Sequence, residues 1–504
     1  MKTRSIGRNA FSNLMAGVLP SLVGLLTIPY IVHGLGSEAY GLMTLVTSII
    51  GYFALIDINV TAGSVKHIAH HYALGEHEQV SSVFSFGALI YLLIGLAGAL
   101  PIYVLAHWLA QVAFKVPAAL VPTAVEVLHI AAFGFLAGQL QSYLQSVPQA
   151  LLRYDVSARF EALFGLLVPL SSVAVIASGY GLREVIFARV LLSAINAFAL
   201  LVSVKRLLPT LRLRRPDRQT VAGVAGFSAY SFLARIANLS YVHSDKLIIG
   251  AYVGLQPLAY YTIASTLGNR VLSLLYRVSA VMFPVASAMA ASGSHDALRS
   301  LYLRMSRYVV YANACALLLV AGFAEPLLQH WLGADYARNG ALILQLTALA
   351  QFVDSLTNIP SLVNDGLGHP RISGAFALTH AIVGLVAVYA LVLDGGIVGA
   401  AYAHVGSALL MTTAFIVYTH GRTIPCALID LWNQVYRPAI PPMLAGLLIG
   451  LLSARLGSES LPKLALLVFT LAALLVLAGL RWILLPADRT AVGAHARRLL
   501  ARGS

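Results

Sequence analysis

The feature that most constrains this chain is a succession of long apolar stretches that carry almost no charge. A stretch of about 20 apolar residues spans the hydrocarbon core of a bilayer as an α-helix, and a helix satisfies its own backbone hydrogen bonds in lipid. The chain is 59% hydrophobic and 10% charged, whereas soluble domains are about 25% charged. The sequence therefore predicts an all-α integral membrane protein.

Fourteen stretches meet this criterion of length and polarity. They lie near residues 10–33, 38–62, 80–105, 118–147, 160–178, 184–204, 221–253, 257–290, 303–323, 339–363, 372–393, 397–419, 438–454 and 462–483. The first stretch, after "MKTRSIGR", is too long for the apolar part of a signal peptide. We expect it to remain as the first transmembrane helix.

The positions of Lys and Arg predict the orientation, because these residues accumulate in cytoplasmic loops. With both termini in the cytoplasm, most of the 33 lysines and arginines fall in inside segments, above all in the loop "KRLLPTLRLRRPDR". The outside loops then contain Lys115, Arg183, Arg338, Arg455 and Lys463. The net charge of +14 is explained by this topology, and nucleic acid is not needed as a partner.

An internal repeat divides the chain at this basic loop. "IVHGLGSEAYGLMTLVTSI" resembles "IIGAYVGLQPLAYYTIASTL", with Tyr40 matching Tyr260, and the segment at Pro148 resembles the segment at Pro360. Six predicted spans separate the copies, so both keep the same membrane orientation. The expected parts are an N-lobe (1–205), a basic linker (206–220), a C-lobe (221–420), two further helices (421–484) and a cytoplasmic tail (485–504).

Five cations lie inside the predicted spans. They are Arg189, Arg235, Lys246, Arg270 and Arg277. A cation at the bilayer centre costs about 2.5–3.5 kcal/mol, so these side chains should face protein or water. Arg189 is close to the outer end of its span, and we interpret it as structural.

The other four cations form two stripes. Arg235 and Lys246 are separated by three helical turns and lie within about 20° of each other, as do Arg270 and Arg277 after two turns. In the functional interpretation, their donors hold a diphosphate in an aqueous cavity. In the structural interpretation, they pair with buried carboxylates. The candidates for that pairing are Asp245, Asp354 and Asp365.

Other motifs favour no enzyme and no cofactor. No Walker A sequence is present, and Cys315 and Cys426 form no CxxC pair. The histidine-rich segment "KHIAHHYALGEHE" has no companion ligands and is predicted to be a solvated inside loop rather than a metal site.

Three segments give the chain a resemblance to a known family. "GLGSEAYG" follows the first span, "DKLIIG" ends the seventh, and "PSLVNDGLGHP" ends the tenth. With fourteen spans, the chain resembles the multidrug/oligosaccharidyl-lipid/polysaccharide (MOP) flippase superfamily, and within it the Wzx-type polysaccharide-transport branch. This resemblance implies a MATE-like fold of two pseudo-symmetric six-helix lobes plus two C-terminal helices.

The resemblance also implies a function in the bacterial inner membrane. The expected substrate is a polyprenyl-diphosphate-linked oligosaccharide, flipped to the outer leaflet by alternating access among membrane lipids. A proton or sodium ion would be the coupling ion, and a polysaccharide polymerase a possible partner. The expected substrate-binding residues are Arg235, Lys246, Arg270 and Arg277, and the gating or ion-coupling residues are Asp57 and Asp245.

Asp57 corresponds to Arg277 at the repeat offset of 220 that Tyr40 and Tyr260 set, which suggests a gate opened by the diphosphate. Two other functions are alternatives to a flippase. A multidrug antiporter should have an acidic cavity. A membrane glycosyltransferase or polymerase would need a larger outside loop.

Overall fold

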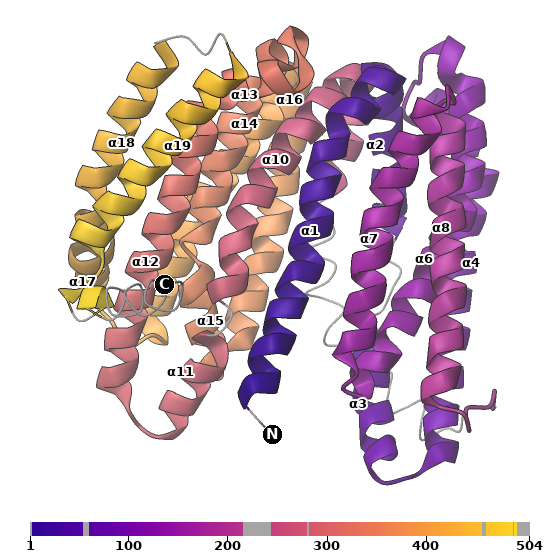
Figure 1. Ribbon diagram of the computed structural model, residues 1–504, viewed down its shortest axis with the longest axis horizontal. Helices are drawn as coiled ribbons and strands as arrows, with labels where there is room; N and C mark the ends of the chain where they lie inside the picture. Colours follow the sequence, from indigo (N-terminus) through magenta and orange to yellow (C-terminus); the bar gives the residue numbers. More distant parts are fainter. Residues whose placement is uncertain are drawn as a thin grey trace, which may run out of the picture. The chain divides into compact units, whose positions relative to one another are not determined.

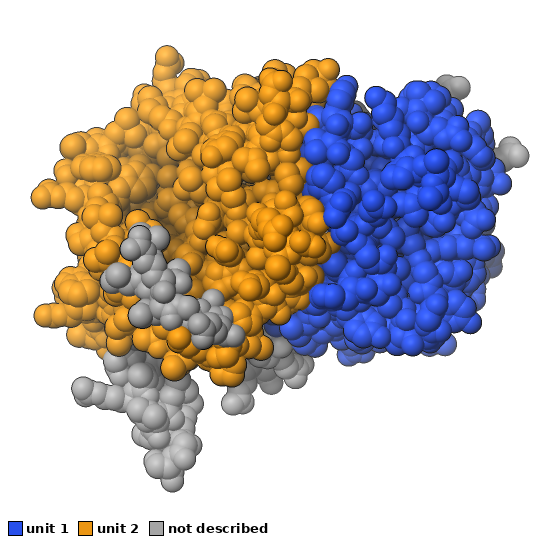
Figure 2. Space-filling model, turned by 90° about the horizontal axis from the view of Figure 1, so that it is seen from above, with its two compact units in different colours: residues 1–259 blue, residues 260–504 orange. Residues whose placement is uncertain are grey.

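The computed structural model describes residues 3–53, 60–214, 243–279, 282–455, 460–486 and 488–490, and these residues form helices and turns without a strand. The prediction of an all-α protein is therefore confirmed. The contacts between residues divide the chain into two compact units, Met1–Ala259 and Tyr260–Ser504 (Figure 2). Asp57 and Arg235 lie outside the described residues, and the side chain of Arg277 is likewise not described.

The first unit contains long helices joined by short turns (Figure 1). In chain order they are α1 (Thr3–Leu35), α2 (Ser37–Phe53), α3 (Val60–Ala73), α4 (His77–Val104), α5 (Ala106–Trp108), η2 (Leu109–Ala113), η3 (Ala118–Leu120), α6 (Val121–Ala150), α7 (Tyr154–Ala177) and α8 (Leu182–Leu207). Residues 243–252 are also helical.

The second unit repeats this pattern and adds helices at its C-terminal end. Its elements are α10 (Leu255–Ser279, which begins in the first unit), α11 (Met282–Ala291), α12 (His295–Gly322), α13 (Ala324–Leu332), α14 (Ala334–Ser355), α15 (Asn358–Gly366), α16 (Pro370–Arg422), α17 (Leu428–Leu431), η4 (Trp432–Tyr436), α18 (Arg437–Arg455), α19 (Leu461–Ala478) and η5 (Gly479–Ile483).

Turn glycines with left-handed backbone mark the repeat. Gly36 (φ 81°) precedes α2, and Gly254 (φ 111°) precedes α10. Gly75 (φ 75°) and Gly293 (φ 68°) precede α4 and α12 in the same way. Both pairs give an offset of 218 residues rather than 220. At this offset Asp57 corresponds to Leu275, so the numbering no longer matches it to Arg277.

The cores of the two units use equivalent positions. In the first unit α3, α4, α6 and α8 meet around buried residues, and in the second unit α11, α12, α15 and α16 do so. Val80 and Phe84 recur as Leu298 and Tyr302 at an offset of 218. At an offset of 212, Val147 recurs as Ile359 and Val204 as Ile416. The same frame of helices is thus packed twice.

Glycine breaks the longest helix. In α16, Gly396 has φ 54° and ψ −139°, so two helices follow each other there. A Cβ at Gly399 would lie 2.0 Å from the Leu391 carbonyl oxygen, so no larger residue fits this tight reversal. The break falls between the predicted spans 372–393 and 397–419. Within the described residues, eight helices are long and apolar enough to cross a membrane.

The histidine-rich segment is helical, which corrects the predicted loop. His67, His70 and His71 lie on α3, and His77 begins α4. His71 Nδ1 lies 2.6 Å from Glu76 Oε2. The apolar residues Val60 and Ile68 of α3 are buried in the core of the first unit. This burial stabilises the helix, whereas the many polar residues of the segment led to the prediction of a loop.

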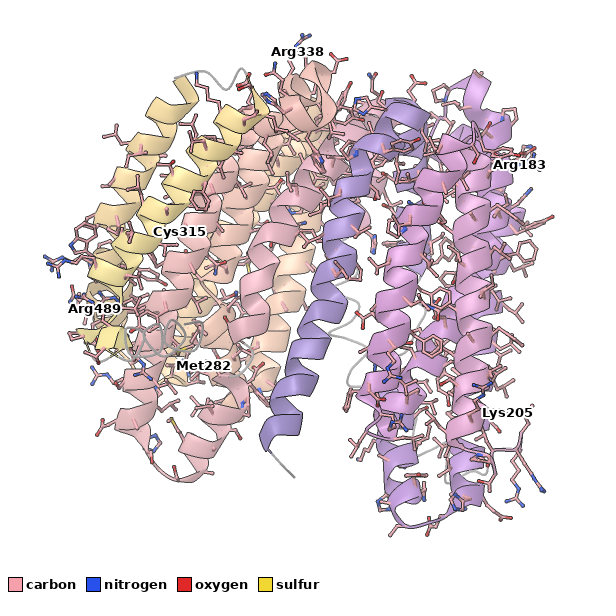
Figure 3. The ribbon with its side chains drawn as sticks, viewed as in Figure 1. Arg183, Lys205, Met282, Cys315, Arg338 and Arg489 are labelled. Carbon is pink, nitrogen blue, oxygen red and sulfur yellow. The ribbon has the colours of Figure 1, made fainter. Side chains whose placement is uncertain are left out.

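Cations mark opposite ends of the helices in each unit. Figure 3 shows Arg183 and Lys205 at the two ends of α8. In the second unit, Arg338 lies at one end, on the first turns of α14, and Arg489 lies toward the other (Figure 3). The sequence predicts that Arg183 and Arg338 lie in outside loops and that Lys205 and Arg489 lie on the cytoplasmic side.

Candidate functional site

The structure brings two predicted site residues together in an ion pair. Lys246 Nζ lies 3.2 Å from Asp245 Oδ1, and the two side chains are 15% and 7% exposed. Both lie in the helical segment 243–252, near the ring of His243, which packs against Gly51 of α2. Because a buried charge without a partner is costly, this contact explains how an apolar helix tolerates Lys246.

Arg270 lies on α10 with an exposed side chain. Its neighbour one turn earlier, Thr266, is half-buried, while Leu267 and Gly268 are buried. The cation therefore occupies the edge of the packed face of α10 and not its centre. Arg270 and Lys246 belong to different units.

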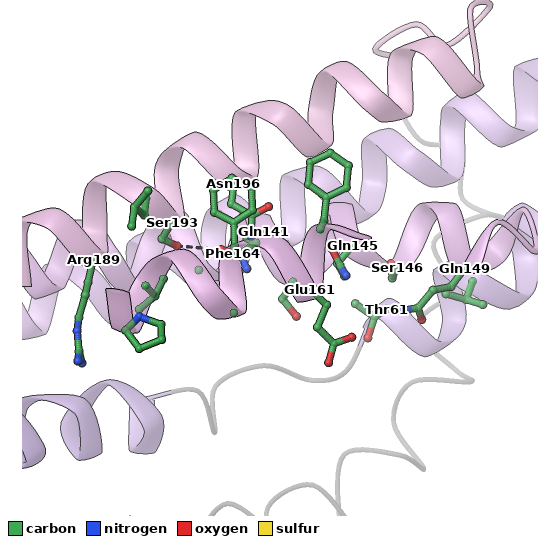
Figure 4. Close-up of a pocket in the computed structure, with 18 residues that line it drawn as sticks. Thr61, Gln141, Gln145, Ser146, Gln149, Glu161, Phe164, Arg189, Ser193 and Asn196 are labelled. Carbon is green, nitrogen blue, oxygen red and sulfur yellow. Dashed lines mark hydrogen bonds between the residues drawn. The ribbon is translucent and has the colours of Figure 1, made fainter. Parts of the chain in front are cut away.

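The first unit carries an open cavity with many polar lining residues, which the sequence did not reveal. Its volume is about 1010 Å³ (Figure 4). It is lined by α6, α7 and α8 together with Thr61 and Val65 of α3. The polar lining residues are Thr61, Gln141, Ser142, Gln145, Ser146, Gln149, Glu161, Arg189, Ser193 and Asn196.

One stripe of α6 supplies most of these groups. Gln141, Gln145 and Gln149 follow at intervals of four residues, so they stand one above another on a single helix face. Ser142 and Ser146 lie beside them. The opposite side of α6 carries Tyr143, Leu144 and Val147, which are buried in the core. The core fixes the rotation of α6, and this rotation turns the amides toward the cavity.

Hydrogen bonds fix part of the lining. Ser193 Oγ donates to Gln141 Oε1 at 3.0 Å (Figure 4). Gln145 Nε2 donates to the Ser157 carbonyl oxygen at 2.8 Å, and Ser157 Oγ donates to the Gln145 carbonyl oxygen at 3.1 Å. These bonds join α6 to α7 and α8 and hold the amides in place.

Charge is sparse in the cavity. Arg189 lies at one end, where its Nε donates to Ser172 Oγ at 2.9 Å, and Glu161 lies further along on α7 (Figure 4). Among the described lining residues these two are the charged ones. The interpretation of Arg189 as purely structural therefore omitted that it forms part of the cavity wall.

The second unit has an equivalent but smaller cavity of about 240 Å³. At the offset of 212, Ser142 corresponds to Asp354 and Val168 to His380. Asp354 Oδ1 lies 3.9 Å from His380 Nδ1. Phe164 corresponds to Phe376, whose ring packs edge-on against Phe415 at 5.3 Å. Larger side chains thus fill a space that is open in the first unit.

Sequence reasoning missed the amide stripe because it searched for charge. A stripe of Gln and Ser inside an apolar span is a weaker signal than an arginine. The spacing Gln141, Gln145, Gln149 was nevertheless visible, since neutral polar residues at intervals of four must face protein or water in a membrane helix. Arg189 was visible as an intramembrane cation.

A fold of long apolar helices, repeated in two units that each carry a cavity with polar lining residues, is typical of a transporter. Residues 35–341, more than half of the chain, match the family of polysaccharide biosynthesis proteins, and the chain belongs to this family. It is a multi-pass membrane protein of polysaccharide biosynthesis. These conclusions agree with the resemblance found in the sequence.

Two curated proteins are similar over much of their length. The chain is 22% identical over 414 residues to a putative O-antigen transporter of Shigella flexneri, covering 79% of this chain and 93% of that protein. It is 23% identical over 341 residues to the uncharacterized membrane protein EpsK of Bacillus subtilis (strain 168), covering 66% and 67%.

Solved structures show the same fold. The lipid II flippase MurJ, in an inward closed conformation, matches with a TM-score of 0.70 at 11% identity, covering 92% of this chain and 97% of that one. A multidrug resistance MATE family transporter of the MOP superfamily, in an inward-facing conformation, matches with a TM-score of 0.69 at 14% identity, covering 80% and 94%. The MATE-like fold that the resemblance implied is therefore confirmed.

Proposed function

We propose that this protein flips a polyprenyl-diphosphate-linked oligosaccharide from the cytoplasmic to the outer leaflet by alternating access. The observation that carries the proposal is the cavity of about 1010 Å³, lined by amides and hydroxyls inside a membrane-spanning unit. Such a cavity suits a sugar, which needs many neutral hydrogen bonds. The similarity to a putative O-antigen transporter and to a lipid II flippase supports it.

The charges are distributed in a way that favours this substrate. A cavity for cationic drugs should be acidic, yet among the described lining residues Glu161 is balanced by Arg189. Arg235, Lys246, Arg270 and Arg277 would bind the diphosphate outside this cavity, since guanidinium groups hold phosphate oxygens bidentately.

The gate would be formed by carboxylates that compete with the diphosphate. Asp245 already pairs with Lys246 at 3.2 Å, so an arriving phosphate would displace one anion by another at the same cation. Asp57 would likewise compete with the diphosphate for a cation. This competition gives the substrate different affinities for two conformations, which any substrate-driven change requires.

The proposal includes the finer architecture. Fourteen spans would form an N-lobe (1–205), a linker (206–220), a C-lobe (221–420) and two additional helices (421–484), with the tail 485–504 and the N-terminus in the cytoplasm. The protein would lie in a bacterial inner membrane, use protons or sodium as the coupling ion, and work with a polysaccharide polymerase.

Reconstitution tests this function. Proteoliposomes loaded with a polyprenyl-diphosphate-linked oligosaccharide should expose it to an external glycosidase faster than liposomes without the protein. Deletion of the gene should remove one surface polysaccharide and leave its lipid-linked precursor in the inner leaflet. Unchanged exposure in the liposomes, together with efflux of a cationic dye driven by an ion gradient, would instead establish the multidrug antiporter.

A further inference from the structure

The proposed function leaves open which residues of the first unit contact the substrate and which part of the substrate they bind. Building on the proposed function, we propose that the cavity of the first unit is the binding site for the sugar residues of the substrate. Gln141, Gln145 and Asn196 would hydrogen-bond the sugar hydroxyl groups, while the cations bind the diphosphate elsewhere.

The amides keep hydrogen-bonding capacity toward the cavity. A side-chain amide has two N–H donors and an oxygen that accepts two bonds. Gln141 uses its oxygen for Ser193, and Gln145 uses one donor for the Ser157 carbonyl. The donors of Gln141 and the oxygen of Gln145 complement hydroxyl groups, each of which both donates and accepts.

Asn196 gives an independent indication of a ligand. Its residue is 3% exposed, it lines the cavity, and its Oδ1 has no hydrogen-bond partner within the described part of the chain. A buried amide oxygen without a partner is destabilising, and Asn196, unlike the similarly buried Asn313, lies in the wall of a cavity from which a donor can reach it. A sugar hydroxyl that donates to Oδ1 would satisfy it.

The cavity is better suited to sugars than to a diphosphate. Arg189 already donates through Nε to Ser172, and Glu161 adds a negative charge to the same lining. Phe164, 9% exposed and stacked on Phe160 with ring centroids 6.4 Å apart, gives the lining an apolar surface. A volume of about 1010 Å³ is at the upper end of ligand sites, which accommodates several sugar rings.

The second unit shows that the amides are not required by the fold. At the offset of 212, Asn196 corresponds to Ala408 and Gln145 to Thr357, and the equivalent helices still pack around Ala408, which is 0% exposed. The frame is therefore stable without an amide at the position of Asn196. This asymmetry indicates that the amides serve a ligand that binds in the first unit.

A pair of variants separates binding from stability. Asn196→Leu removes the buried oxygen without a partner, so the thermal midpoint of the purified protein should stay level or rise, while flipping in proteoliposomes falls at least about tenfold. Asn313→Leu is the matched control, because Asn313 on α12 is 0% exposed and its Nδ2 and Oδ1 also have no partners among the described residues. It should be stabilised with flipping unchanged. A lower midpoint with proportionally reduced flipping in Asn196→Leu would overturn the proposal.

Cysteine labelling locates the sugar directly. Ser142→Cys, in a chain with Cys315→Ala and Cys426→Ala, places a thiol at an exposed position of the cavity wall. The probes are undecaprenyl diphosphate and the lipid-linked oligosaccharide extracted from cells that lack the gene. We expect only the second lipid to slow labelling by a charged methanethiosulfonate, at least about fivefold. Ser178→Cys, in the exposed turn after α7, should label at one rate throughout.

The outcomes distinguish this inference from the proposed function. A rise in the thermal midpoint with both lipids, but equal labelling of Ser142→Cys with and without sugar, would overturn the sugar site and keep the flippase. Slower labelling with both lipids would assign the cavity to the diphosphate and overturn the sugar site. No rise in the midpoint with either lipid would overturn both.

Discussion

The two units have cavities at equivalent positions, but the side chains that line them differ. In the first unit, Ser142 and Val168 leave a space of about 1010 Å³, whereas in the second unit Asp354 and His380 occupy the same positions and about 240 Å³ remains. The helices around both cavities are packed by equivalent buried residues. Because the frame is shared, a few side chains decide which cavity can accept a substrate.

The difference shows how one architecture can divide two tasks. The cavity of the first unit offers neutral hydrogen-bonding groups, whereas the cations proposed for the diphosphate lie outside it, with Lys246 in the first unit and Arg270 and Arg277 on α10. Hydrogen bonds from amides discriminate among hydroxyl groups, while guanidinium groups bind any phosphate. A transporter that separates the two would recognise the variable sugar and the constant diphosphate with different parts of the chain.

The largest effect should come from the cation on the second unit. Arg270→Ala would remove up to two charge-assisted hydrogen bonds and reduce flipping about 100-fold or more. Arg270→Lys should recover part of the activity, because the charge stays but the bidentate geometry is lost. The glycosidase exposure assay measures both. Arg338→Ala, at an exposed position of α14, is the matched control, and full activity of Arg270→Ala would remove this arginine from the mechanism.

Filling the first cavity should have the next largest effect. Ser142→Trp places an indole in the space beside Gln145 and should reduce flipping about tenfold or more, since a bulky ring excludes a ligand from a site of this size. Thr470→Trp, on the exposed face of α19, adds the same ring away from the cavity and should flip normally. Equal activities of the two variants would show that substrate does not enter the first unit.

Copying the second cavity into the first sharpens the comparison. The double variant Ser142→Asp/Val168→His should flip several-fold more slowly than the native protein. Its thermal midpoint should exceed that of Ser142→Asp alone, because the histidine supplies a partner for the introduced carboxylate. Thermal unfolding in detergent measures the second effect. Native flipping in the double variant would mean that the openness of the first cavity has no role.

The smallest effect concerns the pair in the second unit. Asp354 and His380 are 3.9 Å apart and partly buried, so their coupling should be about 0.5–1 kcal/mol. Asp354→Ser, His380→Val and the double variant form the cycle that measures it by thermal unfolding. The double variant copies the first cavity and should unfold closer to the native midpoint than the sum of the single variants. Simple additivity would show that the two side chains do not interact.

The sequence predicted most of the fold because lipid imposes a uniform rule. A helix that must cross a bilayer needs a long apolar run, and α4, α6, α7 and α8 could be recognised from that run alone. The helix α3 was missed, because its burial comes from core contacts of Val60 and Ile68 rather than from overall hydropathy. The repeat was visible, but its offset needed the turn glycines.

The candidate site was less predictable than the fold. Lys246 and Asp245 were both recognised, and their adjacency in the chain makes the 3.2 Å contact easy to form. The cavity depends instead on Gln141 of α6 meeting Ser193 of α8, residues brought together by the packing of helices far apart in sequence. A single sequence shows which face of each helix is polar. Which polar faces meet is decided by how the helices pack around the core.

The turn glycines have a consequence for how such a chain changes over time. Gly36, Gly75, Gly254 and Gly293 hold backbone angles that cost other residues about 1–2 kcal/mol each. Ser142 and Asp354 line cavities, where the backbone sets no such constraint, and they differ between the two units. After a sequence has been duplicated, we expect such glycines to be retained longest as the two copies diverge. They offer a register for aligning the halves of other proteins whose remaining similarity has faded.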